Sequence, residues 1–274
     1  TEKDPLVIGG GPCSYNPEPI ADFFVIFYIG EGETRYDDLF DLYKQMKKNG
    51  KSRQEMLHEI AKIPGMYVPS LYTVSYKEDG TIDTFAPIYD DVPKTIKKEI
   101  EMDLSTSVYP EKPVVPFIKA TQDRIVLEIQ RGCIRGCRFC QAGMIYRPNR
   151  EKSVARLKEL AEQMIASTGH DEISLSSLSS SDYSELEELI NYLIDECGKK
   201  KINISLPSLR IDAFSLDIMQ KVQDIKKSSL TFAPEAGTQR LRNVINKGLT
   251  VDNIMNGSKQ AFEGGWNKVK LYFM

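Results

Sequence analysis

The sequence predicts an α/β fold in which parallel strands are joined by helical crossovers. From residue 125 onward, strand-like apolar runs alternate regularly with helix-like amphipathic segments that are long enough to serve as crossovers. The expected strands are 125–130, 172–178, 202–206, 229–233 and 268–273, and the expected helices are 151–167, 183–196, 214–225 and 251–263. This pattern fits an open parallel sheet and a barrel equally well.

The first part of the chain shows the same alternation on a smaller scale. We expect strands at 6–9 and 25–30 and helices at 18–24 and 36–47. This order is typical of the end of a doubly wound sheet. Three regions are therefore predicted: a partial doubly wound domain at 1–49, a connecting region at 50–124 and a core at 125–274.

The connecting region has weaker local signals. Residues 53–63 predict a helix, and the apolar runs on either side of Asp79-Gly80 predict a hairpin. The proline-rich residues 110–116 predict a stiff approach to the core.

Composition describes an ordinary globular chain, with 41% apolar and 27% charged residues. A net charge of -3 argues against a broad field that attracts nucleic acid but leaves room for a local basic groove. RNA, protein and small molecules therefore all stay open as substrates. No apolar stretch approaches the roughly 18 residues of a membrane span, and the N-terminal residues have no signal-peptide pattern. We therefore expect a cytoplasmic protein without membrane partners.

The sequence carries three cysteines in one loop, Cys133, Cys137 and Cys140, directly after the strand expected at 125–130. Their Cys-x3-Cys-x2-Cys spacing can hold three irons of a 4Fe-4S cluster and leave the fourth iron without a protein ligand. A zinc site normally has four ligands, and neither His58 nor His170 is close in sequence. Zinc and chance clustering of small buried residues are the alternatives.

The cysteine loop resembles that of the radical S-adenosylmethionine (radical SAM) enzymes, in which this spacing follows the first barrel strand. The resemblance implies a partial (β/α)6 radical SAM barrel, truncated after about five strands, preceded by the C-terminal part of a Rossmann-like cobalamin-binding-type domain. It implies that Cys133, Cys137 and Cys140 hold the cluster, whose open iron takes the amino and carboxylate groups of S-adenosylmethionine. Electron transfer from a reductant such as flavodoxin or ferredoxin then cleaves the cofactor to methionine and a 5'-deoxyadenosyl radical.

The ends of the chain bear on the same resemblance. The sequence has no initiator Met and stops inside the apolar run 268–274. We expect an internal fragment, with the sixth barrel strand beyond Met274.

Several polar residues fall at the expected carboxyl ends of strands, where parallel βα folds collect their ligands. The resemblance places Phe139 against the adenine of the cofactor. Ser177, Ser179 and Ser180 stand where many relatives carry a Gly-Gly-Glu motif for the methionine amino group. A loop and helix cap explains this serine run equally well.

Two further strand ends carry candidate ligands. Arg210 has the planar fork that suits the methionine carboxylate or a nearby substrate anion, with a salt bridge to Asp212 or Asp217 as the alternative. Glu235 and Arg240 lie in a segment similar to the ribose-contacting region of the family. For Glu235, capping of the next helix is the competing interpretation.

Residues 141–150 resemble the stretch that follows the cluster in cobalamin-linked radical SAM proteins and methylthiotransferases. Tyr146 and Arg147 are candidates to face the active site, and a helix-initiating turn is the alternative. Outside this region we expect Cys13 and Cys197 to be buried thiols and Trp266 to belong to the core.

The glycine run at 9–11, with the glycines near residue 30, is similar to the last two strands of a cobalamin-binding-like domain. The Asp-x-His-x-x-Gly element that ligates cobalt in that family does not occur in this sequence, and we expect structural roles for His58 and His170. Cobalamin is therefore an open candidate cofactor.

The favoured function is a radical SAM enzyme of the cobalamin-binding-domain-linked group, related to methylthiotransferase-type cores. Its substrate is open, and radical methylation and methylthiolation are the candidate reactions. The alternatives are an iron-sulfur electron-transfer or scaffold module without S-adenosylmethionine chemistry and a zinc-stabilised binding protein.

Anaerobic reconstitution of the full-length protein should give about one oxygen-sensitive 4Fe-4S cluster, because three loop thiolates are available. Changing Cys133, Cys137 or Cys140 singly to Ala should abolish it, as measured by iron and sulfide content. A normal cluster in any of these variants would refute the ligand assignment, and zinc without iron or sulfide would favour the zinc-stabilised alternative.

Overall fold

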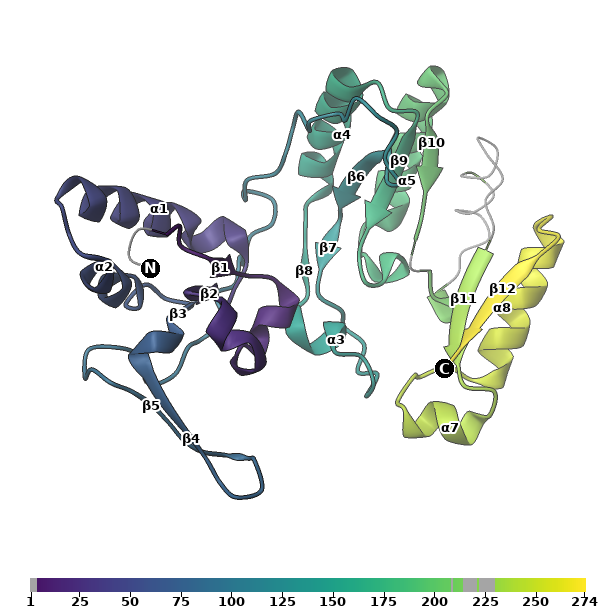
Figure 1. The fold of residues 1–274 in the computed structure, drawn as a ribbon. Helices are drawn as coiled ribbons and strands as arrows, with labels where there is room; N and C mark the ends of the chain where they lie inside the picture. The colour runs from purple at the N-terminus through teal and green to yellow at the C-terminus, as the bar shows by residue number, and fades with distance from the viewer. Residues whose placement is uncertain (1–3, 208, 214–220, 222–229) are drawn as a thin grey trace. The chain divides into compact units, whose positions relative to one another are not determined.

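The computed structural model describes residues 4–207, 209–213, 221 and 230–274. The chain forms two compact units, Thr1–Met102 and Asp103–Met274 (Figure 1). The sequence predicted boundaries near residues 49 and 124, so the structural division falls inside the expected connecting region.

The first unit is built on a small sheet of order β1-β2-β3. Strands β1 and β2 pair in parallel, as the alternating pattern predicted. Helices α1 and α2 then pack against each other. The elements of this unit are β1 (Ile8–Gly9), the 3-10 helices η1 (Pro12–Tyr15) and η2 (Glu18–Phe23), β2 (Ile26–Tyr28), α1 (Gly32–Lys48), α2 (Arg53–Ile60), β3 (Met66–Tyr67), η3 (Pro69–Leu71), β4 (Tyr72–Tyr76) and β5 (Ile82–Pro87).

Residues 50–102 join this unit because they complete its sheet and its core. Strand β3 pairs antiparallel with β2, with Tyr67 opposite Phe27. Leu57 and Ile60 of α2 are buried in the same apolar cluster as these strands. The predicted hairpin around Asp79-Gly80 is confirmed as the antiparallel pair β4-β5.

The second unit contains the predicted parallel βα order. Strands β10-β9-β6 form one parallel sheet, and β11 and β12 form a parallel pair. The expected helix at 214–225 falls mostly outside the described residues. The elements are β6 (Ile125–Glu128), β7 (Gln130–Arg131), α3 (Ala142–Ile145), β8 (Arg150–Glu151), α4 (Val154–Thr168), β9 (Glu172–Ser176), η4 (Ser180–Asp182), α5 (Leu186–Lys200), β10 (Asn203–Ser205), η5 (Ile211–Ala213), β11 (Leu230–Glu235), α7 (Gln239–Val244), α8 (Val251–Glu263) and β12 (Val269–Phe273).

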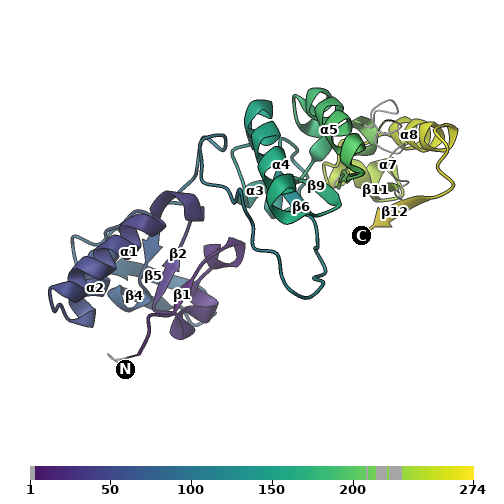
Figure 2. The ribbon, with the colours of Figure 1, turned by 90° about the horizontal axis from the view of Figure 1, so that it is seen from above.

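Helices α4 and α5 lie side by side and pack against the β10-β9-β6 sheet (Figures 1 and 2). Their apolar residues recur at helical spacing, as in Leu157, Leu160, Ala161 and Met164 of α4, and they form the main core with the strands. The Ser153 hydroxyl accepts from the backbone N–H of Arg156 and so caps the first turn of α4. The α/β class predicted from periodicity is thereby confirmed.

Of the residues expected to be buried outside the candidate site, two are buried and one is not. Trp266 is buried in a smaller core, and Cys197 is buried, where desolvation raises the pKa of its thiol to about 11. Cys13 is exposed, so the prediction that it is a buried thiol was wrong. It lies in the short 3-10 turn after β1 and not in the sheet. His58 contacts the carboxylate of Asp91 at 3.0 Å.

Within the part of the chain that the structure describes, no helix combines the length and apolar character needed to cross a membrane.

The substitution Leu175→Ala in the central strand β9 should lower the free energy of unfolding by about 2–5 kcal/mol, because the side chain is fully buried and its removal leaves a cavity. The matched control is Leu241→Ala on α7, where the leucine is 41% exposed and the loss should be within about 0.5 kcal/mol. Denaturant titration measures both, and equal losses would contradict the core assignment.

Candidate functional site

The cysteine loop is closed at its base by a short ladder. Strand β7 pairs antiparallel with β8, so residues 132–149 leave and re-enter the sheet at one place. The buried Arg150 side chain donates to the backbone carbonyls of Pro148 at 3.0 Å and Tyr146 at 3.1 Å. The loop is therefore held from inside by an arginine that satisfies its carbonyl groups.

Glycine is required at position 132, where the loop begins. Gly132 has φ = 99°, a left-handed conformation that favours glycine. A Cβ atom there would lie 2.7 Å from the carbonyl oxygens of both Pro148 and Tyr146. The loop can close only because this residue has no side chain.

The cysteines have the chemistry expected of cluster ligands. Cys133, Cys137 and Cys140 are free thiols. The backbone N–H of Arg135 donates to Cys133 Sγ at 3.4 Å, and that of Gly143 donates to Cys140 Sγ at 3.3 Å. Such donors stabilise thiolate and cluster sulfur, so the donor set fits a cluster bound through three thiolates. No group of three or more His, Cys, Asp or Glu among the described residues is arranged to hold a single metal ion.

The three cysteines open onto one cavity of about 260 Å³. Its walls come from the cysteine loop, the loops that follow β9 and β10, the C-terminal end of β11 and the turn that follows α7. Apart from that turn, these segments lie near the carboxyl ends of the parallel strands, where ligands of parallel βα folds gather. The lining residues are Cys133, Arg135, Cys137, Phe139, Cys140, Leu178, Ser179, Leu209, Arg210, Ala233, Glu235 and Lys247. The structure thus brings together most of the residues singled out from the sequence and adds Arg135 and Lys247.

The other predicted residues lie outside these walls. Ser177 and Ser180 hydroxyls bond each other at 2.9 Å, and Ser180, which is fully buried, donates to the carbonyl of Pro207. These two serines hold the loop after β9 and the loop after β10 together. Arg240 is exposed on α7, whereas Arg242 is buried and donates to backbone carbonyls. Tyr146 and Arg147 make contacts within the cysteine loop and do not line the cavity.

Arg210 lines the cavity, but its guanidinium group is already paired with a carboxylate. Its Nε and Nη2 donate to the two carboxylate oxygens of Asp212, each at 2.9 Å. Nη2 also lies 3.3 Å from the carbonyl of Lys247. The salt bridge that the sequence left as the alternative is present, and the side chain is only 10% exposed.

Glu235 and Lys247, which also line the cavity, form a second pair. Lys247 Nζ lies 3.2 Å from Glu235 Oε1, and the two side chains are 11% and 16% exposed. The ammonium is also 5.8 Å from the ring centroid of Phe139. Glu235 has φ = 66°, an unusual conformation for a residue with a side chain, which costs of order 1–3 kcal/mol and is typical of functional sites.

Lys247 was missed because it is far from any strand end in sequence. It follows α7 in a turn that contains Asn246 at φ = 54° and Gly248 at φ = 70°. The Asn-Lys-Gly run was the available sequence signal, since Asn and Gly favour the left-handed region. Asn246 also donates to the carbonyl of Gly136 at 2.7 Å, which ties this turn to the cysteine loop.

A third pair connects the cysteine loop to the loop after β9. Arg135 donates through Nε to Asp182 Oδ2 at 2.9 Å and through Nη2 to Oδ1. Ser179 donates to the same carboxylate at 2.7 Å. Burial favours the neutral acid, but the bonds from Arg135 and Ser179 outweigh it and hold the pKa of Asp182 below its ordinary value.

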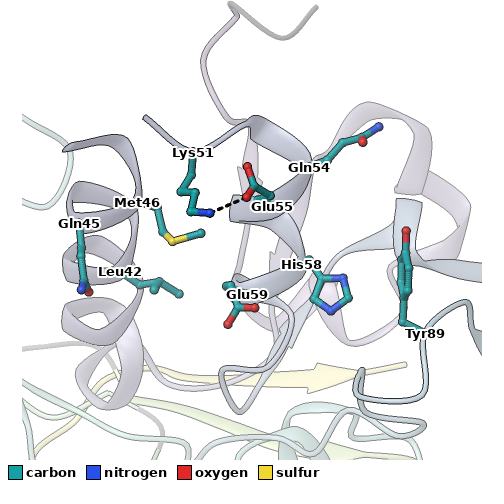
Figure 3. A pocket seen from close by; sticks show the side chains of 9 residues that line it. All are labelled: Leu42, Gln45, Met46, Lys51, Gln54, Glu55, His58, Glu59 and Tyr89. Carbon is teal, nitrogen blue, oxygen red and sulfur yellow. Dashed lines mark hydrogen bonds and ion pairs between the residues drawn. The ribbon is translucent and has the colours of Figure 1, made fainter. Parts of the chain in front are cut away.

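A larger cavity, of about 530 Å³, lies in the first unit beside α1 and α2 (Figure 3). Its charged residues are mostly satisfied close by: Lys51 pairs with Glu55 at 2.7 Å, and His58 with Asp91. It contains no cysteine and none of the predicted ligands. Although this cavity is larger, its lining residues do not make it the candidate functional site.

Comparison with known proteins relates both parts of the chain to radical SAM proteins. Residues 127–274 match the model of the radical SAM superfamily, and residues 1–69 match the N-terminal domain of radical SAM proteins. An uncharacterised protein of Methanocaldococcus jannaschii is 31% identical over 279 residues, which cover 98% of this chain and 51% of that protein. The chain thus spans about half the length of this curated relative.

Solved structures show the same fold at low identity. OxsB, a cobalamin-dependent S-adenosylmethionine radical enzyme, superposes with a TM-score of 0.58 at 16% identity, covering 98% of this chain and 36% of that one. The radical S-adenosylmethionine methyltransferase TsrM of Kitasatospora setae gives 0.57 at 12% identity, covering 98% and 49%. The family match spans more than half of the 274 residues and includes the cysteine loop and the cavity walls, which shows that this chain belongs to the radical SAM superfamily.

Proposed function

We propose that this chain is the cluster-binding and cofactor-binding part of a radical SAM enzyme. In this proposal Cys133, Cys137 and Cys140 hold a 4Fe-4S cluster, and the cavity beside them takes S-adenosylmethionine. When bound, the cluster supplies the electron for reductive cleavage of S-adenosylmethionine to methionine and a 5'-deoxyadenosyl radical. The observation that carries the proposal is that three free cysteine thiols and the polar side chains of three further strand ends line one cavity.

The walls suit the parts of this cofactor. The ring of Phe139 is 44% exposed, so it can present a face to adenine. The Glu235 carboxylate can accept hydrogen bonds from ribose hydroxyls through Oε2 while Oε1 keeps its bond to Lys247. Leu178, Leu209 and Ala233 supply apolar surface that excludes water.

The methionine end needs a cation for its carboxylate and acceptors for its ammonium. Because Nε and Nη2 of Arg210 are bonded to Asp212, Nη1 is the nitrogen we assign to the methionine carboxylate. Ser179 lines the cavity and is our candidate for the ammonium. In this proposal Ser177 and Ser180 support the surrounding loops, and neither these serines nor the exposed Arg240 touch the cofactor.

The first unit is proposed to be a cobalamin-binding-type domain. Support comes from the family match at residues 1–69 and from the fold shared with OxsB and TsrM, whose structures contain cobalamin. The sequence has no Asp-x-His-x-x-Gly element, so it offers no histidine of that kind as a cobalt ligand. We derive no step through cobalamin. Radical methylation and methylthiolation are the proposed reaction classes.

The rest of the proposal concerns the complete protein. A flavodoxin or ferredoxin is the proposed reductant, the cytoplasm is the proposed location, and the substrate is an RNA, a protein or a small molecule. The alternative, an iron-sulfur module that only transfers electrons, is less well supported because such a module needs no cavity with paired polar walls.

Replacing Glu235 with Ala should weaken S-adenosylmethionine binding to the reconstituted full-length protein by about 1.5–3 kcal/mol, because a charged hydrogen-bond acceptor is lost. Cluster content should not change, since Glu235 is not a proposed ligand of iron. Isothermal titration and iron analysis are the measurements.

The matched control is Glu263→Ala, which removes the acid of another Lys–Glu pair, 3.7 Å from Lys259 and exposed on α8. Its affinity for the cofactor should equal that of the parent protein. Unchanged affinity in Glu235→Ala would return Glu235 to a structural role, and a parent protein with an intact cluster but no cofactor binding would favour the electron-transfer module.

A further inference from the structure

Arg135 of the cysteine loop makes two kinds of contact: its backbone contacts a cysteine thiol, and its side chain forms an ion pair. Its backbone N–H donates to Cys133 Sγ at 3.4 Å. Its guanidinium forms the two-pronged bond to Asp182 in the loop after β9. A third contact, 3.7 Å, runs from its Nη1 to Asp212 in the loop after β10.

Asp182 is suited to hold this arginine in one position. Its side chain is only 7% exposed. Ser179 donates to the same oxygen that receives Arg135 Nε. The carboxylate is thus fixed by a hydroxyl and a guanidinium, and it is not used to cap α5, whose first turn has no side-chain cap.

We propose that Arg135 is a positioning residue for the iron-sulfur cluster: through Asp182 it fixes the Cys133 end of the loop, and the pair balances charge beside the cluster. The inference rests on the proposed function. It assigns to this arginine two separable effects, one on the geometry of the loop and one on the local field.

The geometric effect follows from connectivity. The Cys133 thiol, the N–H that contacts it and the guanidinium anchor all lie within three consecutive residues, 133–135. Releasing the side chain therefore releases the N–H donor as well. Cluster binding by three cysteines should survive, but iron should be lost to a chelator several-fold faster.

The electrostatic effect should shift the redox potential of the cluster in a way that a purely structural contact would not. The Arg135–Asp182 pair is neutral as a whole. Removing the positive charge leaves Asp182 unbalanced near the cluster and disfavours addition of an electron, whereas removing the negative charge leaves Arg135 unbalanced and favours it. The two neutral variants should shift the cluster potential in opposite directions.

The test uses the full-length protein, reconstituted anaerobically, with Arg135→Gln and Asp182→Asn. We expect the midpoint potential of the cluster, followed by electron paramagnetic resonance during a redox titration, to fall in Arg135→Gln and to rise in Asp182→Asn. The double variant should return toward the parent potential while still losing iron faster. Arg135→Lys, which keeps the charge but not the two-pronged geometry, should keep the potential and lose iron faster.

The chain offers a matched control at the other end of the same strands. Arg124, just before β6, pairs with Glu172 at the start of β9. Arg124→Gln and Glu172→Gln should leave both the potential and the rate of iron loss unchanged.

Potential shifts in the same direction, or none, in the two neutral variants would overturn the charge-balance part. If either neutral variant does not fold, Arg135→Lys decides the geometric part, and an unchanged rate of iron loss would overturn it. A parent protein that takes up no cluster would instead overturn the proposed function, which keeps the two failures distinct.

Discussion

Three ion pairs contribute residues to the lining of the cavity, and two of them join separate segments of the chain. Arg135 pairs with Asp182, Arg210 with Asp212, and Lys247 with Glu235. The first and third pairs and the bond from Arg210 to the Lys247 carbonyl cross from one part of the chain to another. Loops at the ends of strands have no ladder of backbone hydrogen bonds, so side-chain pairs must fix them. The Arg210–Asp212 and Lys247–Glu235 pairs are largely buried, so removing a single partner leaves an uncompensated charge, which typically costs about 3–5 kcal/mol.

These pairs also explain how a polar cavity can exist before any ligand binds. Each cation in the wall has an acid partner, so the cavity carries no isolated buried charge among its described lining residues. A ligand with both positive and negative groups, such as S-adenosylmethionine, can then bind by adding to existing pairs. The walls are organised in advance, and less binding free energy is lost to ordering side chains.

The comparison of the two cavities shows why chemistry identifies the site better than size. The cavity in the first unit is about twice as large, yet most of its lining residues come from the consecutive helices α1 and α2, and its Lys51–Glu55 ion pair is exposed. The smaller cavity gathers residues from 133 to 247 that have no reason to meet except the parallel strand order. A binding site in this fold requires polar residues from distant parts of the sequence to meet at the carboxyl ends of the parallel strands.

The sequence by itself determined the local elements and the cysteine loop. Helical and strand periodicity located α4, α5, α8 and the parallel strands β6, β9, β10, β11 and β12 of the second unit, because burial of one face imposes a repeat that is readable in a single segment. The cysteine spacing likewise lies within eight residues. Tertiary structure decided everything that depends on a distant partner: the antiparallel β3 that joins residues 50–102 to the first unit, the bond from Arg210 to the Lys247 carbonyl, and the contacts of Arg135 and Lys247. Arg135 and Asp182 are 47 positions apart, and no local pattern encodes which of many charged residues will meet at a strand end.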